Sequence, residues 1–379
     1  MTHDPGNRVA VAFSGGLDST AAAIILKQKG YDVLALTMLL PLKAGQAESS
    51  VEPCRALADR LGVEHEAVDM RGPFDRMVIR PFLEAYRSGL TPNPCITCNK
   101  RLKFGLLLEH ARKRGCGLMA TGHYARLSTE KKGQVTDEPG SAGEEFTLFR
   151  GRDRAKDQSY VLWTLDQAKL SHVLLPLGEL TREDCKSIVT GAGVRDLVQP
   201  ESQDICFLSG RSYRSLIAET DPGAARPGPV LDHESTVLGT HKGLPFYTVG
   251  QRHGLGIASH QALYVLELRP AENALVVGGI EHRSCRQFEV EGTSFVSGNK
   301  PPGSITCEVA TRYRGPPLPA RLTILPHDRG SVGYVEPGPP SAPGQSAVFY
   351  EGDRLLGGAF ISRPVRVPHN PTPLDDNRL

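Results

Sequence analysis

The stretch VAVAFSGGLDST, residues 9–20, decides the fold of this chain. Its apolar first half predicts a buried strand over Val9–Phe13, and its second half predicts a helix over Asp18–Lys29. The two glycines between them let backbone N–H groups turn toward an anion at the helix N-terminus, where the helix dipole also favours negative charge. The loop matches neither GxxxxGK[ST] nor GxGxxG. It is therefore either a phosphate-binding turn of another kind or a Gly-rich turn capped by Asp18 or Ser19.

Strands and helices alternate on the C-terminal side of this turn. The pattern predicts further strands over 33–38, 64–69 and 118–121, and helices over 51–61, 75–87 and 99–114. Such alternation favours an α/β fold with a doubly wound parallel sheet. The polar segment 130–145 is expected to be an exposed loop, and residues 160–195 are expected to be helical again.

The second half of the chain has a different sequence pattern. Short apolar stretches rich in glycine fill 218–269, and from residue 286 the pattern is that of short strands and turns, typical of a small barrel. We expect a catalytic domain over 1–210, a small central domain over 211–282, a C-terminal β-barrel over 283–365, and a Pro-rich, disordered tail over 366–379.

Composition excludes several classes of protein. The 379 residues carry 44 Lys and Arg against 42 Asp and Glu, a net charge of +2, so the chain is no polycation, although a local basic face could still bind nucleic acid. No apolar run approaches the roughly 20 residues of a membrane span, and the N-terminus lacks a signal pattern. We expect a cytoplasmic protein without a membrane partner. Its eight cysteines are then not a disulfide framework.

Three cysteines stand out from the other five. Cys95 and Cys98 lie in TPNPCITCNK, residues 91–100, just before a predicted helix that Asn99 can cap. A thiol at a helix start near Lys100 is expected to have a depressed pKa. Cys206 follows in the polar SQDICF, although most free cysteines are core residues. The other five are interpreted as structural: Cys54, Cys116, Cys185, Cys285 and Cys307.

The loop SGGxDS, in its strand–turn–helix setting, resembles that of the PP-loop ATP pyrophosphatases. The resemblance implies that the loop binds the pyrophosphate part of ATP, that AMP is transferred to a substrate, and that Asp18 helps to hold Mg²⁺. Several enzymes share this loop, so the rest of the chain must distinguish them.

Seven further motifs follow in order between residues 8 and 362. They are TPNPxxxCNKxxKF, ATGHYAR (120–126), KDQSYVL (156–162), ICF, GQRxGLGI (250–257), TRYR (311–314) and PGQSAVFY (343–350). Together they resemble the tRNA-specific 2-thiouridylase (MnmA) family. The resemblance implies ATP-dependent 2-thiolation of the wobble uridine 34 in tRNAs for Lys, Glu and Gln. The partners that it implies are the tRNA anticodon loop and a sulfur donor, such as a cysteine desulfurase or a sulfur-relay protein.

The resemblance also assigns residues. Cys98 matches the family's nucleophile and Cys206 its persulfide-bearing cysteine, while His123 matches a site near the reaction centre. The positions that would contact ATP are Ala12, Phe13, Ser14, Gly15, Gly16, Leu17, Asp18, Ser19, Met38 and Gly122. Those that would touch the target base are Asn93, Pro94 and Cys95, and those that would contact tRNA elsewhere are Lys156, Asp157, Gln158, Arg312, Tyr313 and Gln345.

One position departs from the family pattern. Where the family's best-studied form has Asp, this chain has Cys95, which removes an acid/base candidate and offers three thiols to one site. Sulfur could reach the uridine from a Cys206 persulfide, with Cys98 closing a disulfide. Alternatively, Cys95, Cys98 and Cys206 could hold a [4Fe–4S] cluster with one open iron, which the replacement favours. A zinc site with His123 as fourth ligand is a third option.

Two rival functions remain open on the sequence. One is another PP-loop enzyme that forms AMP while it modifies an RNA or a small molecule. The other is a non-catalytic protein that binds RNA or an iron–sulfur cluster and keeps a relic loop. The intact SGGLDS argues against the second, and tRNA-dependent formation of AMP would distinguish all three. The Gly-rich GQRHGLGI is expected to form tight turns that present Arg252 to RNA.

Overall fold

The structure is a computed structural model that describes residues 7–41, 51–131, 134–136, 144–200, 205–208 and 210–365. The expected tail over 366–379 lies outside these residues. A five-stranded sheet in the order β3-β2-β1-β4-β8 forms the N-terminal part, and its strand pairs are all parallel. Its strands are β1 (Arg8–Ala12), β2 (Asp32–Leu39), β3 (Glu64–Asp69), β4 (Leu118–Ala120) and β8 (Val173–Leu174). The expected α/β fold is confirmed.

Helices cover both faces of this sheet because the side chains of each strand alternate. Val9 and Val11 of β1 point to a core shared with α1 (Leu17–Gln28), α3 (Val51–Leu61) and α9 (Arg182–Gly191). Ala10 points to the opposite core, which contains the residues of α7 (Leu108–Lys113). The apolar strand β1 is therefore buried on both faces, as a central parallel strand must be.

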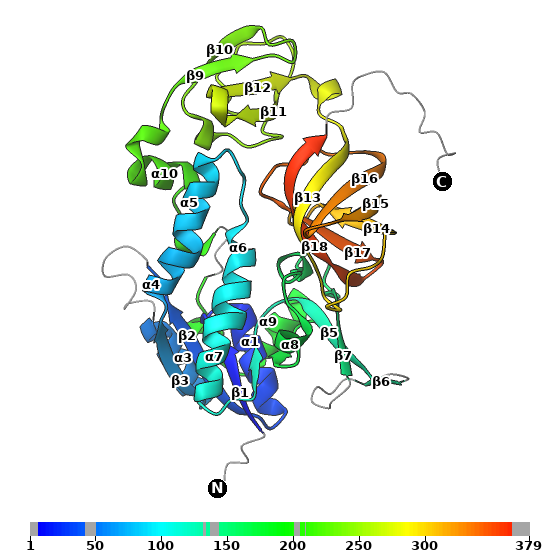
Figure 1. Cartoon of the computed structure of the whole chain (residues 1–379). Coiled ribbons are helices and arrows are strands. Elements are labelled where there is room, and N and C mark those ends of the chain that lie inside the picture. The colour runs from blue at the N-terminus through cyan, green and yellow to red at the C-terminus, as the bar shows by residue number, and fades with distance from the viewer. Residues whose placement is uncertain are drawn as a thin grey trace.

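Two long helical rods rise from the sheet toward the central domain (Figure 1). One contains α4 (Arg71–Phe74), a π-helical turn over Asp75–Ile79 and α5 (Arg80–Arg87). The other contains α6 (Pro94–Thr97), a π-helical stretch over Cys98–Leu107 and α7. The second rod therefore begins five residues before the predicted start at Asn99. Asn93 caps it by accepting the N–H of Cys95, whereas Asn99 is buried and its side chain donates to Val161 O.

The segment expected as a loop over 130–145 includes strands. β5 (Ala125–Lys131) pairs with β6 (Gln134–Thr136) and β7 (Glu144–Arg150), and β7 pairs with β18 (Arg354–Val365) near the end of the chain. Phe146 and Leu148 of β7 are buried in the core beneath the parallel sheet. This hairpin fastens the N-terminal part to the barrel, beside which it lies in Figure 1.

The C-terminal barrel is closed by six strands in the order β13-β16-β15-β14-β17-β18, with β13 pairing back to β18. Their bounds are β13 (Cys285–Phe295), β14 (Ser304–Ala310), β15 (Leu318–Leu325), β16 (Arg329–Gly338) and β17 (Ser346–Glu351). Inward residues such as Phe288, Leu322 and Phe349 fill its core. This part of the sequence prediction is confirmed, because alternating strands with short turns are a local signal.

The central part holds a four-stranded sheet in the order β10-β9-β12-β11. Its strands are β9 (Gly228–Leu231), β10 (Val237–His241), β11 (Tyr264–Arg269) and β12 (Ala274–Gly278), preceded by α10 (Tyr213–Thr220). The helices expected over 160–195 reduce to α8 (Gln167–Leu170) and α9, with turns and the short strand β8 between them. Single helical turns occupy 159–161, 195–197, 206–208, 222–224, 244–246, 270–272 and 280–282.

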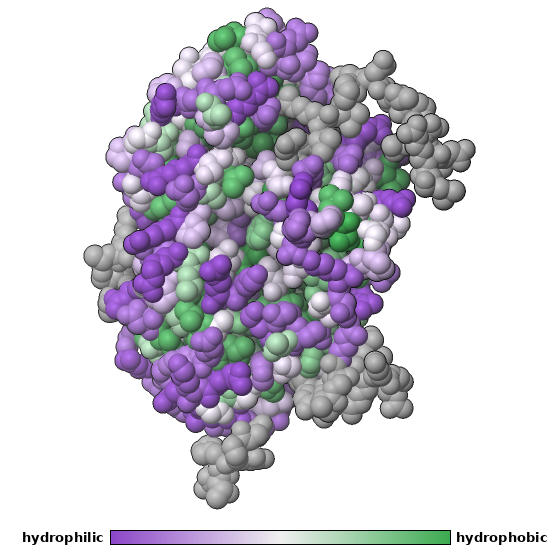
Figure 2. Space-filling view, in the orientation of Figure 1, coloured by the Kyte–Doolittle hydropathy of each residue, from purple (hydrophilic) through white to green (hydrophobic). Residues whose placement is uncertain are grey.

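Among the described residues, no helix is both long and apolar enough to cross a membrane. The face shown in Figure 2 is mostly hydrophilic, with small hydrophobic areas scattered over all three parts.

Candidate active site

The turn that follows β1 is arranged to receive an anion. Gly16 stands at the N-cap of α1 with no side-chain cap, so the first-turn N–H groups are not blocked by a capping side chain. The Ser19 and Thr20 hydroxyls donate to Gly16 O at 3.1 and 2.8 Å, and Ser14 N–H donates to Ser19 Oγ at 3.2 Å. These bonds hold the loop in shape before a ligand arrives.

Two positions require glycine because neighbouring atoms leave no room for a Cβ. Gly15 has φ +71°, and a Cβ there would lie 3.0 Å from the Cys54 sulfur. A Cβ on Gly122, which follows β4, would lie 2.7 Å from the Asp18 carbonyl carbon. The loop is thus packed between α3 on one side and the segment after β4 on the other. Tyr124 donates its hydroxyl to Asp18 at 2.8 Å, a contact that the sequence did not indicate.

The predicted ATP-contacting residues meet at one edge of the sheet. Ala12 ends β1, Met38 lies next to the end of β2, and Gly122 follows the end of β4. Carboxyl ends of parallel strands share an edge, and that edge is where ligands bind in open α/β sheets. The structure therefore brings Met38 and Gly122 to the same edge as the loop over residues 12–19.

The second helical rod carries the cysteine segment, and the apolar cluster of Cys98 includes Leu40, which directly follows the end of β2. Cys98 is buried, in one apolar cluster with Phe207 and Leu208, the two residues that follow Cys206. Cys95 and Cys206 are exposed, and all eight cysteines have free thiols. The structure thus brings the three cysteines singled out from the sequence into one region, although 108 residues separate Cys98 from Cys206. The other five are buried, as expected.

The expected depressed pKa of the thiols at the helix start is wrong. Loss of solvation among the packed side chains raises the pKa of Cys95 and of Cys98, and it raises that of Cys206 to about 12, with a smaller contribution from the charges of Cys98 and Cys95. Cys95 and Cys206 nevertheless keep part of their surface exposed. The apolar side chains of the two rods that pack around Cys98 disfavour a thiolate. This packing could not be foreseen from the sequence. The cation that opposes this rise at all three is Lys103 rather than Lys100. Lys103 lies five residues after Cys98, the spacing that a π-helical turn places on one face.

The positions of the three cysteine side chains can be compared with what a metal site requires. In the part of the chain that the structure describes, no three His, Cys, Asp or Glu side chains form a group that could hold a metal ion. As placed, the three thiols therefore do not present the ligand set that a [4Fe–4S] cluster or a zinc ion requires.

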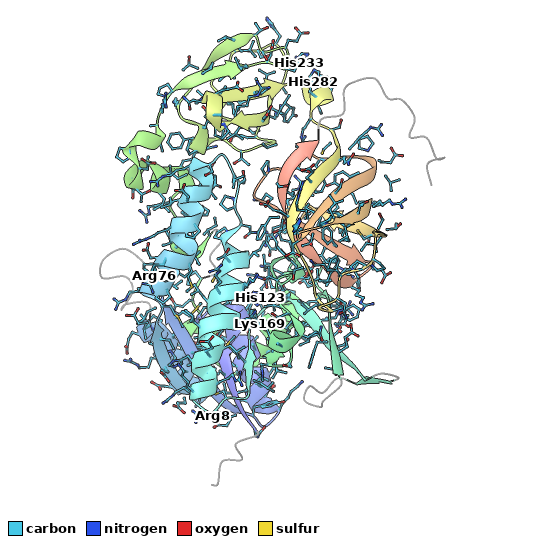
Figure 3. The ribbon with its side chains drawn as sticks, viewed as in Figure 1. Arg8, Arg76, His123, Lys169, His233 and His282 are labelled. Atoms are coloured by element: carbon cyan, nitrogen blue, oxygen red, sulfur yellow. The ribbon has the colours of Figure 1, made fainter. Side chains whose placement is uncertain are left out.

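His123 lies deep in the molecule (Figure 3), at 6% exposure. Its Nδ1 is 2.6 Å from Thr121 Oγ1, and its ring is 6.0 Å from that of Phe104. Burial, and next the charge of Lys103, lower its pKa well below the ordinary value, so the ring is neutral at pH 7. A buried neutral imidazole of lowered pKa is a weak base, so the role that it suits is to orient a polar group through its ring nitrogens.

The barrel contributes two of the predicted tRNA residues to the cysteine segment. Gln345 donates its side-chain amide to Thr91 O at 2.8 Å, and Thr91 N–H donates to Pro343 O at 2.7 Å. Tyr313 is close enough to Cys95 and Asp157 for their negative charges to raise its pKa, after burial as the main cause. Arg314 stacks on the Tyr313 ring at 5.3 Å. Residues predicted to contact tRNA, from the distant barrel, therefore lie beside the segment that carries Cys95.

Two other predicted tRNA residues make mainly internal contacts. Asp157 accepts from the N–H groups of Gly151 and Ser159 at 3.0 and 3.1 Å. Gln158 exchanges two hydrogen bonds with the backbone of Tyr124. Their side chains hold the KDQS turn beside the active site. Lys156 in that turn is half-buried, and Arg312 on the barrel is exposed.

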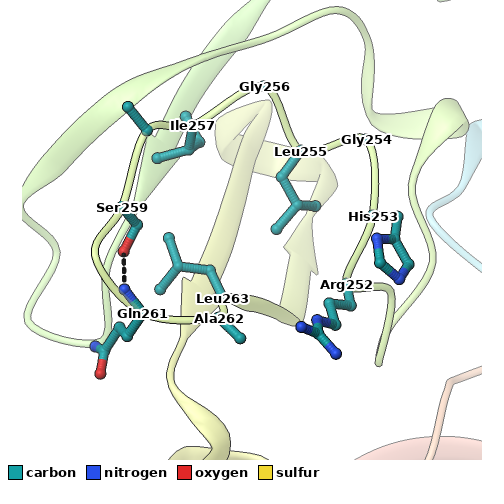
Figure 4. Close-up of a pocket in the computed structure, with 11 residues that line it drawn as sticks. Arg252, His253, Gly254, Leu255, Gly256, Ile257, Ser259, Gln261, Ala262 and Leu263 are labelled. Atoms are coloured by element: carbon teal, nitrogen blue, oxygen red, sulfur yellow. Dashed lines mark hydrogen bonds between the residues drawn. The ribbon is translucent and has the colours of Figure 1, made fainter.

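The Gly-rich loop of the central part surrounds a hollow of its own (Figure 4). Gly250, Gly254 and Gly256 have φ between +72° and +88°, which gives the predicted tight turns. Leu255 is buried, while Arg252 and its neighbour His253 are exposed at one side of the ring. Arg252 is thus accessible, and its contact with RNA stays a prediction.

Known protein families match all three parts of the chain. Family models match residues 7–210 as "tRNA methyl transferase HUP domain", 220–279 as "tRNA methyl transferase PRC-barrel domain" and 285–361 as "Aminomethyltransferase beta-barrel domain". The tRNA-specific 2-thiouridylase MnmA of Desulforudis audaxviator is 42% identical, and that of Roseiflexus castenholzii is 39% identical. Both alignments span 94% of this chain and 99% of the relative. The chain therefore belongs to the tRNA-specific 2-thiouridylase family.

Proposed function

We propose that this protein is a tRNA-uridine 2-sulfurtransferase, which uses ATP to replace the C2 oxygen of the wobble uridine 34 by sulfur in tRNAs for Lys, Glu and Gln. The observation that carries the proposal is the convergence of an open phosphate loop, three thiols and barrel residues at one sheet edge. Membership of the family supports the same chemistry. The part over 1–210 would perform it, and the parts over 211–282 and 283–365 would hold the anticodon stem and loop.

The first step activates a poor leaving group. The uridine C2 oxygen attacks the α-phosphorus of ATP, the bond to the bridging oxygen breaks, and its electron pair leaves with pyrophosphate. The N–H groups at the start of α1 would bind the phosphates. Asp18, one carboxylate beside the loop, fits Mg²⁺, which proteins commonly hold through one or two carboxylates and the phosphates themselves. Bound Mg²⁺ would neutralise phosphate charge.

For the second step we propose sulfur transfer through thiols alone, because the described side chains do not form a cluster site. A donor loads Cys206 with a persulfide, whose terminal sulfur attacks C2 and expels AMP. The Cys98 thiolate then attacks the Cys206 sulfur, the sulfur–sulfur bond to the product breaks, and a Cys98–Cys206 disulfide remains. A dithiol reductant restores both thiols with two electrons.

The experiment combines tRNA carrying U34 with ATP, a persulfide donor and the full chain, and measures AMP and 2-thiouridine by mass spectrometry. We expect one AMP for each thiouridine. The Cys98→Ser and Cys206→Ser variants should form no thiouridine, and Cys307→Ser, a buried barrel thiol, is the control. AMP formation that does not depend on tRNA would contradict the function and favour another PP-loop enzyme. No AMP at all would favour a non-catalytic RNA-binding protein.

The sulfur route has its own test. Iron and acid-labile sulfide are measured on protein purified without oxygen, alongside Cys95→Ala, Cys98→Ala and Cys206→Ala. The thiol route predicts little of either, and a persulfide trapped on Cys206. Stoichiometric iron and sulfide, lost in all three variants, would overturn the thiol route and establish a three-cysteine cluster.

A further inference from the structure

A second hollow, of about 400 Å³, lies beside the ATP loop on the side of α9. Leu17, the first residue of α1, forms one wall, and the segment Val198–Pro200 forms another. Arg182 and Arg195 complete the lining, so that the described residues around the hollow include two guanidinium groups and no carboxylate. Guanidinium groups bind phosphate oxygens through paired N–H donors.

The hollow is joined to the loop by direct bonds. Gln199 N–H donates to Gly15 O at 2.8 Å, and Gly16 forms a parallel bridge with Gln199. One wall of the hollow is therefore bonded to the residues that would bind the phosphates. An anion that extends past the start of α1 would enter this hollow.

Of the two helix N-termini near the hollow, only one is open. At α9, Thr181 and Asp184 form a complete capping box, and Arg182 N–H donates to Asp153 at 3.0 Å. These bonds already occupy the N–H groups of Arg182 and Asp184, so α9 contributes to the lining of the hollow through Arg182. At α1 no side chain caps the helix. The arrangement suits an anion that lies across the α1 N-terminus and reaches toward the two arginines.

We propose that Arg182 and Arg195 bind the pyrophosphate end of ATP and the pyrophosphate that leaves. When the α-phosphorus–oxygen bond breaks, the electron pair passes to the pyrophosphate, and the two cations would stabilise the added negative charge. Both arginines line a hollow next to Leu17 at the start of α1, so they would act on the adenylation step. The proposal rests on the proposed function for its catalytic meaning, but the binding site can be tested without turnover.

The test measures the affinity of the full chain for inorganic pyrophosphate by calorimetry, without tRNA or sulfur donor. We expect the Kd to rise about tenfold in Arg182→Ala and in Arg195→Ala, and further in the double variant, as removal of one charge-assisted hydrogen bond of roughly 1.4 kcal/mol would cause. Arg112→Ala, an exposed arginine on α7, is the matched control and should leave the Kd unchanged. Arg182→Lys and Arg195→Lys keep the charge and most of the side-chain volume. They should give intermediate values even if an alanine variant folds poorly.

A second arm asks whether the phosphate comes from tRNA instead. The Kd for tRNA is measured at two salt concentrations, because an arginine bound to an RNA phosphate adds about one to the salt slope, and its alanine variant removes that amount. We expect no change in that slope. A reduced slope with unchanged pyrophosphate affinity would overturn the proposal and assign the arginines to the RNA backbone. Unchanged values in both arms would show that the hollow binds no phosphate. Arginine-dependent pyrophosphate binding in a chain that thiolates no tRNA would sustain the site and reject only the function.

Discussion

At the scale of single residues, Lys103 is the cation that favours the thiolate form of the cysteines. Its cation opposes the rise in pKa that burial causes at Cys98 and Cys206. The Lys103→Met variant should therefore alkylate at both cysteines about three- to tenfold more slowly at pH 8, with the pH–rate profile moved to higher pH. Peptide mass spectrometry after timed iodoacetamide labelling gives the rates. Lys100→Met, exposed on the same rod, is the control, and identical profiles for all three proteins would refute the role.

His123 makes stability depend on pH in a specific direction. Its pKa in the folded chain is lowered well below 6.5, so in weakly acidic solution the unfolded chain binds a proton that the folded chain does not. Below pH 6.5 the wild type should lose free energy of unfolding relative to His123→Asn, by about 1.4 kcal/mol per pH unit. Urea unfolding of both proteins at pH 7.5, 6.5 and 5.5 measures this difference. A constant difference across the series would show that His123 has the same pKa in the folded and the unfolded chain, and would contradict the lowered value.

The three cysteines of the candidate site could be selected from the sequence, and their roles stay predictions. Cys95, Cys98 and Cys206 could be singled out from short motifs. The reactivity of those thiols could not, because the apolar groups that raise the pKa of Cys98 lie on α5 and around Phe207, far away in the sequence. Lys103 was visible only as one of several basic residues, since a π-helical turn cannot be recognised from the sequence.

At the scale of elements, the bond from Gln199 to the ATP loop joins the phosphate site to the segment that leads to Cys206. Gln199→Pro removes the N–H that donates to Gly15 O at 2.8 Å, and we expect tRNA-dependent AMP formation to fall about tenfold. Gln199→Ala keeps that N–H and should show a smaller loss. The amount of AMP formed in single turnover separates this effect from any change in sulfur transfer. Equal losses in the two variants would assign the effect to the side chain instead.

Elements with a periodic pattern were predictable, and elements that depend on a distant partner were not. β3 lies at the expected residues 64–69, and the barrel strands follow their alternation. The expected loop over 130–145 contains β6 and the ends of β5 and β7, because its polar composition hides strands whose pairing partner, β18, lies about 200 residues later. The early start of the second rod depends on Asn93, which caps it, whereas Asn99 had been the expected cap.

At the scale of the whole molecule, the barrel is docked on the cysteine segment through Gly344. Its φ is +88°, and a Cβ there would lie 2.9 Å from both Leu90 Cβ and Thr91 N. Gly344→Ala should therefore separate the two parts, speed hydrogen exchange of the Thr91 amide, and lower thiolation about tenfold while pyrophosphate binding is unchanged. Gly352→Ala, at φ +57° in a barrel turn with open space around it, carries similar backbone strain without the clash. If both variants lose activity equally, strain within the barrel is the cause. If only Gly344→Ala does, the barrel completes the tRNA site by holding Gln345 against Thr91.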